Sequence, residues 1–108
     1  MKPLWIKWYP SLWLHSTARD EMNAAQRATF QDFVCLSAIS PTPGFFKYSS
    51  INGLARMLNT EATIVQSTIA ICVERKRISI EENEEGFLLS ICKWDTYQSF
   101  KSDVNDKN

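Results

Sequence analysis

The chain has 108 residues, of which 44% are apolar, and its twelve Lys and Arg side chains are balanced by twelve Asp and Glu side chains. This length provides for one hydrophobic core and leaves no room for a second. A net charge of zero argues against a domain that holds nucleic acid by charge alone, although it is compatible with a local basic patch.

The N-terminal segment, residues 1–14, is rich in tryptophan. Its apolar residues alternate with a period of two on either side of Pro10, with Leu4, Ile6 and Trp8 before the proline and Leu12 and Leu14 after it. This period is typical of an edge strand. We therefore expect an aromatic arm that lies against the core, in which Trp5, Trp8 and Trp13 pack with Trp94 and Tyr97.

A long helix is indicated after residue 23, because Asn23 can cap it and Gln26 occupies the position of a capping-box partner. The residues that follow at helical spacing are Phe30, Phe33, Val34 and Ser37. This helix must end before Pro41. A weaker pattern indicates a short helix within residues 15–22. Residues 40–44 have the composition of a turn, and the aromatic run Phe45–Tyr48 predicts a strand.

Residues 49–92 show the order helix, tight turn, helix and two-stranded hairpin. Ser49 or Ser50 can cap a helix that runs through residue 58, the pair Asn59 and Thr60 breaks it, and a second helix spans residues 61 to about 74. Strands are expected at 78–80 and 87–92, around a turn at 81–86. This order predicts an α+β winged helix with an N-terminal aromatic arm, an architecture that usually binds nucleic acid or protein. We assign residues 1–98 to this domain and 99–108 to a polar tail or the start of a linker.

The three cysteines, Cys35, Cys72 and Cys92, lie in runs that read as buried helix or strand, and none has a neighbour at metal-ligand spacing. We interpret them as core thiols in a reducing compartment. The N-terminal segment lacks the unbroken apolar run of a secretory signal, and no stretch reaches the roughly 18 apolar residues of a membrane span. These features favour a cytoplasmic protein without a membrane partner.

Enzyme chemistry is poorly supported by the sequence. His15 is the only histidine, the three glycines form no phosphate-binding loop, and no Ser or Cys has a recognisable base beside it. We expect no catalysis, no cofactor and no metal.

The second helix of the motif is the candidate recognition helix. Thr63, Gln66 and Ser67 are expected on its outer side, where Gln66 could bond an adenine edge and the hydroxyls could bond bases or phosphates. Ile64 and Ile71 share a stripe outside the expected core, which comprises Val65, Thr68, Ile69 and Cys72, with Val73 considered as well. Three interpretations of this stripe stay open: burial against a partner or the arm, contact with DNA, and a slightly rotated core face.

Basic and acidic residues are separated around the hairpin. Arg75, Lys76 and Arg77 form the best basic cluster, to which Lys47 and Lys93 could add, although a basic run at a helix C-terminus also complements the helix dipole. Four glutamates surround Asn83 in the expected turn: Glu81, Glu82, Glu84 and Glu85. Their charge would repel a DNA backbone at short range, so any DNA binding is expected to be weak.

The sequence resembles the N-terminal winged-helix domain of phage replisome organisers and DnaD-type primosomal replication initiators. The resemblance rests on an aromatic opening (Trp5, Ile6, Lys7), the run at residues 22–27 before an apolar helix, and the closing run at residues 94–98. It also includes core positions of the motif: Leu54, Ala55, Leu58, Val65, Ile69, Cys72, Val73, and the strand at residues 78–80. Asn59 and Lys76 stand where the family commonly has glycine.

The resemblance implies a phage or prophage protein that helps to start DNA replication. Such a domain would bind duplex or single-stranded DNA or self-associate, while a separate C-terminal region contacts helicase-loading proteins. Two alternatives remain: a winged helix that serves as an oligomerisation or protein-interaction module with little DNA binding, and a transcriptional regulator. A basic and polar outer helix would favour DNA, an apolar one would favour assembly, and the residues here are mixed.

Overall fold

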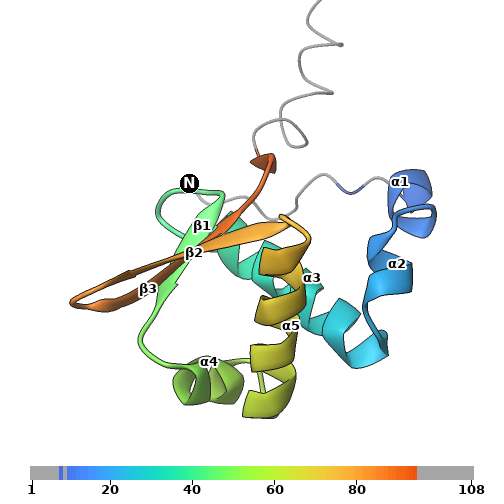
Figure 1. Ribbon diagram of the computed structural model, residues 1–108. Helices are drawn as coiled ribbons and strands as arrows, with labels where there is room; N and C mark the ends of the chain where they lie inside the picture. The colour runs from blue at the N-terminus through green and yellow to red at the C-terminus, as the bar shows by residue number, and fades with distance from the viewer. Residues whose placement is uncertain (1–7, 9, 95–108) are drawn as a thin grey trace, which may run out of the picture.

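The computed structural model describes residue 8 and residues 10–94 of the chain (Figure 1). In this part of the chain the elements follow one another as α1 (Pro10–Leu14), α2 (Ala18–Glu21), α3 (Ala24–Ile39), β1 (Phe45–Tyr48), α4 (Ile51–Met57), α5 (Ala62–Glu74), β2 (Ile78–Asn83) and β3 (Gly86–Ile91). The predicted α+β class is confirmed. The helices surround a core that a small antiparallel sheet completes, and α1 and α2 lie farthest from that sheet (Figure 1).

The sheet has the strand order β1-β3-β2, and both pairings are antiparallel. Leu89 of the central strand pairs with Phe46 on one side and with Ile80 on the other. Alternate residues of these strands therefore face the helices, among them Phe46, Ile78 and Leu89, which are all buried. The helices α3 and α5 both contact this face, and the β2–β3 hairpin projects beyond them (Figure 1).

Helix α3 begins as predicted. The Asn23 side chain accepts a hydrogen bond from the Gln26 N–H at 2.8 Å, and the Gln26 side chain accepts one from the Asn23 N–H at 3.0 Å. This capping box satisfies donors that the first turn leaves free. The helix ends at Ile39, before Pro41, and its Phe33 is completely buried in the core.

The α4–α5 corner also follows the prediction. Ser50 is the residue that caps α4, because its side chain accepts a hydrogen bond from the Gly53 N–H. Asn59 has a φ of 57°, a left-handed conformation that asparagine tolerates better than most residues. Helix α5 starts at Ala62, one residue later than predicted, because Glu61 is extended and serves as the N-cap. This corner orients α5 across α4.

The prediction of an alternating strand is wrong for residues 10–14, which form the helix α1. Proline is well tolerated at the first position of a helix, and five residues are too few to distinguish the two periods. The helix directs Trp13 toward Phe30, with ring centroids 6.4 Å apart, and toward Trp8, at 5.3 Å. Leu14 is 59% exposed. Trp5 and Tyr97 lie outside the described residues, and so do the expected arm at 1–7 and the expected tail at 99–108.

The surroundings of Trp94 and of the cysteines differ in part from the sequence predictions. Trp94 packs on Gly44, a contact that was not predicted, and an added Cβ at Gly44 would lie 3.1 Å from the indole Cδ1 atom. The prediction of a core thiol is wrong for Cys35, which is exposed on the outer side of α3, whereas Cys72 is buried and Cys92 is half-buried. Burial raises the pKa of the Cys72 thiol to about 11, despite the nearby Arg77 guanidinium, which lowers it.

The first hairpin strand is longer than predicted, whereas the second keeps its predicted length but begins and ends one residue earlier, at Gly86 and Ile91. β2 continues to Asn83, so Glu81 and Glu82 belong to the strand and only Glu84 and Glu85 form the turn. The Asn83 side chain accepts a hydrogen bond from the Glu85 N–H at 2.8 Å and so stabilises the turn. The whole arrangement is compatible with a winged helix. No helix within the described residues is both long and apolar enough to cross a bilayer.

Candidate nucleic-acid interface

Helix α5 presents to solvent a face that is uncharged except for Glu74, its last residue. Its inner side is fixed by Val65, Thr68 and Cys72, which are buried against α3, α4 and the sheet. The Thr68 hydroxyl is satisfied there, because it donates to the Ile64 carbonyl at 2.7 Å. The opposite side carries exposed residues at helical spacing: Thr63, Gln66, Ala70, Val73 and Glu74. Two of the three predicted base-contacting residues, Thr63 and Gln66, therefore lie together on an accessible surface.

Ser67, the third predicted contact, lies on the flank of α5 that faces α3. Its hydroxyl accepts a hydrogen bond from Gln26 Nε2 at 3.1 Å and can donate to the Ile64 carbonyl at 3.1 Å. The residue is exposed, but these bonds tie it to the first turn of α3. The sequence predicts only a capping role for Gln26, because a contact across 41 residues leaves no local signal.

The apolar stripe on α5, formed by Ile64 and Ile71, is partly buried inside the molecule. Ile71 is half-buried and packs against the core, so the expectation that the core leaves it free is wrong. Ile64 is also half-buried, whereas Val73, considered as a core residue, is 43% exposed. The buried side of the helix is thus rotated toward Ile71 and away from Val73. This agrees with the third interpretation of the stripe, a slightly rotated core face.

The three residues Arg75, Lys76 and Arg77 form a turn between α5 and β2, which we call the basic turn. Lys76 has a φ of 60°, and the Arg77 N–H donates to the Cys72 carbonyl at 2.8 Å, which closes the end of α5. Lys93 lies at the same end of the hairpin, because the N–H of the preceding residue, Cys92, donates to the Arg77 carbonyl at 2.9 Å. Arg75, Lys76 and Lys93 are exposed.

Arg77 is engaged with α2. Its Nε donates to Glu21 Oε1 at 3.1 Å and its Nη2 donates to the Thr17 hydroxyl at 2.7 Å, and Arg75 Nε lies 4.0 Å from Glu21 Oε2. Burial by itself would raise the pKa of Glu21, but hydrogen bonds from Arg77 and Thr17 and the charges of both arginines outweigh it, so this pKa is lowered. No local sequence pattern indicates Glu21 or Thr17 as part of this site, because they lie 56 and 60 residues from Arg77.

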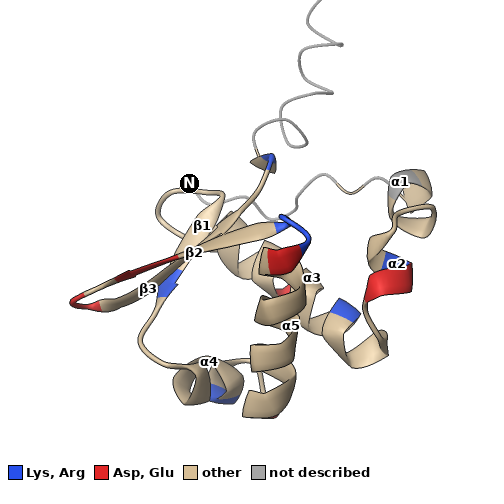
Figure 2. Ribbon diagram, in the orientation of Figure 1, with Lys and Arg blue, Asp and Glu red and all other residues tan. Residues whose placement is uncertain are grey.

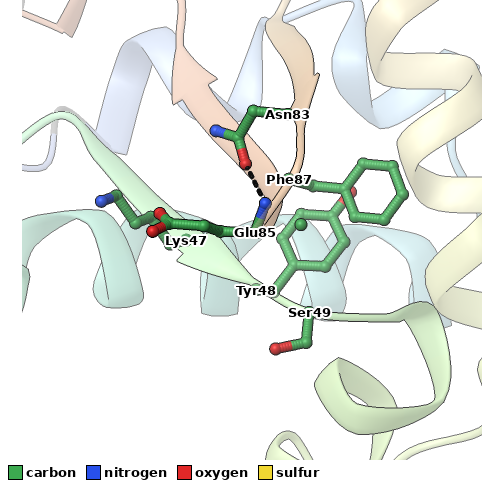
Figure 3. A pocket seen from close by; sticks show the side chains of 7 residues that line it. Lys47, Tyr48, Ser49, Asn83, Glu85 and Phe87 are labelled. Carbon is green, nitrogen blue, oxygen red and sulfur yellow. Dashed lines mark hydrogen bonds between the residues drawn. The ribbon is translucent and has the colours of Figure 1, made fainter.

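Lys47 is separate from the basic turn. It is exposed on β1 and pairs with Leu88 of β3, four residues before Cys92, which corresponds to about 13 Å along a strand. With Tyr48, Asn83, Glu85 and Phe87 it surrounds a shallow hollow of about 110 Å³ beside the hairpin (Figure 3). Glu85 lines the same hollow as Lys47, so a phosphate held there would also lie near a carboxylate.

The four glutamates of the hairpin are all exposed and lie toward its free end, whereas the basic turn lies at the opposite end (Figure 2). The strongest negative and positive charges near α5 are therefore separated along the hairpin. Among the described residues, no three His, Cys, Asp or Glu side chains gather in a way that could hold a metal ion.

No protein-family model matches the sequence, and neither a curated protein nor a solved structure is significantly similar to it.

Proposed function

We propose that this protein is a winged-helix module of a DNA replication initiation protein, similar to replisome organisers, and that it binds DNA weakly without catalysis. The observation that carries the proposal is the sequence of α4, a tight turn, α5 and the β2–β3 hairpin, packed so that Thr63 and Gln66 of α5 remain exposed. An outward helix on a small rigid base is how helix-turn-helix proteins enter a major groove.

The side chains on and beside α5 support weak DNA binding. Gln66 can bond the N6 and N7 atoms of adenine, and Thr63 can bond a base or a phosphate. Arg75 and Lys76 are exposed directly after the C-terminal end of the same helix, and Arg56 is exposed on α4, so positive charge is available on two elements to meet phosphates. The acidic hairpin opposes this grip, which is why we expect weak binding.

The role in replication initiation is supported by the resemblance to replisome organisers and DnaD-type initiators. Several matching residues serve the interior of this domain, including Leu54, Ala55, Val65 and Cys72, which are all buried. A contact with helicase-loading proteins is part of the same proposal.

The test is a fluorescence-anisotropy titration of the full chain with a labelled duplex of about 20 base pairs, two helical turns, over roughly 50 to 200 mM salt. We expect binding that weakens with salt, and we expect Arg75→Gln with Lys76→Gln to lower the slope of log affinity against log salt by about 0.9 per lost contact. Gln31→Ala, at an exposed position of α3, is the control. Absence of binding at low salt, or an unchanged slope, would refute this function.

A second candidate is self-association, which the mostly uncharged outer face of α5 and the acidic hairpin favour. Met57 of α4 is 60% exposed and Val73 of α5 is 43% exposed, so apolar side chains are available for a contact between copies. Ile71 is unsuitable for testing it, because a charge there would disturb the core. Replacing Met57 and Val73 together with Glu should give a folded monomer if these residues lie in a dimer contact, and an unchanged mass in light scattering would contradict that.

A further inference from the structure

The ion pair between α2 and the basic turn bears directly on DNA binding. We propose that the Glu21 carboxylate restrains DNA binding, because DNA phosphates must compete with it for Arg77 and Arg75. This inference rests on the proposed function and adds a means of regulating the same surface: whatever moves α2 or removes the charge of Glu21 would strengthen the grip on DNA.

The hydrogen bonds of Arg77 limit how its guanidinium can bind a phosphate. A guanidinium holds a phosphate best with two parallel N–H groups. Nε and Nη2 of Arg77 already donate to Glu21 Oε1, at 3.1 Å, and to the Thr17 hydroxyl, at 2.7 Å. One edge of the guanidinium is therefore occupied from within the molecule, and a phosphate can use that edge only by displacing α2 groups.

The charged side chains of Glu21, Arg77 and Arg75 differ in their exposure to solvent. The side chain of Glu21 is 12% exposed, that of Arg77 is 23% exposed and that of Arg75 is 52% exposed. Charges in a partly buried site attract each other more strongly than charges in water, and salt screens them less. Arg75 is thus accessible to a phosphate, but it lies 4.0 Å from the Glu21 carboxylate, which cancels part of its charge.

Glu21 is also held in place independently of the arginines. Ala18 and Met22, on either side of it, are 1% and 2% exposed and belong to the hydrophobic core. Arg27 of α3 donates from Nη1 to the carbonyls of Arg19, at 3.2 Å, and Met22, at 2.8 Å. Because α2 is anchored in this way, the carboxylate meets the basic turn at little entropic cost, as a preorganised competitor.

Glu21→Gln is the decisive variant, because glutamine keeps the oxygen that accepts from Arg77 and removes the charge. Asp20→Asn is the matched control: it removes one charge from the same helix, but Asp20 is exposed and adjacent positions of a helix do not face each other. Both are compared with the unaltered chain in the anisotropy titration with the labelled duplex, and thermal unfolding followed by circular dichroism checks that each is folded.

We expect Glu21→Gln to bind about fivefold more tightly, which corresponds to about 1 kcal/mol, the attraction of two unit charges 4 Å apart in water. Its slope of log affinity against log salt should steepen by up to about 0.9, the value of one added phosphate contact, which a purely structural effect would not produce. The gain should vanish when Arg75 and Arg77 are both replaced with Gln.

The outcomes separate this inference from the proposed function. Tighter and more salt-dependent binding by Glu21→Gln than by Asp20→Asn supports the inference. Binding by the unaltered chain with no gain in Glu21→Gln, or an equal gain in Asp20→Asn, overturns the inference and leaves the proposed function standing. Absence of binding by every variant at low salt overturns both.

Discussion

The two ends of the β2–β3 hairpin differ in packing and in charge. At the base, Ile78 is 2% exposed and pairs with Ile91, and Arg77 beside it is bound to α2. At the tip, the turn at Glu84 and Glu85 is exposed and its carboxylates make no ion pair among the described residues (Figure 2). The base therefore contributes to folding stability, whereas the tip affects what can approach the surface.

This difference separates the residues that shape the domain from those that can be changed to test its function. A substitution at the base alters the free energy of unfolding through lost contacts. A substitution at the tip alters the electrostatic potential near α5 and leaves the fold almost unchanged.

The largest effect is expected at the base. Ile78→Ala should lower the free energy of unfolding by about 2–5 kcal/mol, because it removes buried methyl groups and leaves a cavity against the helices. Glu84→Ala at the tip should stay within about 0.5 kcal/mol of the unaltered chain. Urea unfolding followed by circular dichroism measures both, and equal losses would mean that the hairpin is not divided in this way.

A smaller loss is expected where the tip joins β1. Gly86 has a φ of 138°, and a Cβ there would lie 2.6 Å from the Tyr48 carbonyl oxygen (Figure 3 shows this region). Gly86→Ala should therefore cost about 1–3 kcal/mol through strain and displacement of the backbone.

Gly53→Ala is the matched control for Gly86→Ala. It lies in the helix α4, where alanine is favoured by up to about 1 kcal/mol, and its Cβ would meet only the Ser50 side-chain oxygen, at 3.2 Å. The same urea measurement applies. If Gly86→Ala lowered the free energy of unfolding no more than Gly53→Ala does, the close approach of Gly86 to the Tyr48 backbone would not be rigid.

Local signals explain why the fold was largely predictable. The capping box at Asn23, the cap of α4, for which Ser49 and Ser50 were both candidates, and the helix break at Asn59 depend on residues at most a few positions apart, and these features were predicted. The segment Pro10–Leu14 was not, because its short apolar pattern suits a strand as well as a helix and only its packing on Phe30 distinguishes them.

The candidate site was less predictable, because its important contacts are distant in the sequence. Thr63 and Gln66 were placed outward from helical period alone. No local pattern pairs Arg77 with Glu21 or ties Ser67 to Gln26. The side of α5 that carries Ile71 was misjudged for the same reason, since the rotation of a helix depends on which neighbours cover it.

An intermediate effect on stability is expected for the ion pair at the base. The folded-state pKa of Glu21 is lowered from 4.5, so its contribution to stability is fully present above that pH and is lost as the pH falls through the folded-state pKa. Glu21→Gln should therefore be less stable by about 1–2 kcal/mol at about pH 7.

The unaltered chain and Glu21→Gln should then approach the same free energy of unfolding as the solution is acidified below the folded-state pKa of Glu21. The raised pKa of Asp32, which burial causes, acts in the opposite direction but is common to both proteins and cancels in the comparison. Unfolding free energies from urea titrations over a range of pH give the difference. A difference that stays constant with pH would contradict a charged, paired Glu21.

The smallest effect is expected at the tip. Changing Glu82 and Glu84 together to Gln should tighten binding of the labelled duplex by at most about fivefold, because the repulsion of unit charges in water is about 1 kcal/mol at 4 Å and is screened beyond about 10 Å at 0.1 M salt. Stability should not change. Asp20→Asn, on α2 at the far side of the molecule from the tip (Figure 1), removes one charge where the tip variant removes two, so it serves as the control when the effects are compared per charge removed. If both variants bind alike, the tip does not approach the backbone of DNA, and a self-associating domain with an acidic hairpin turned away from its partner becomes the better account.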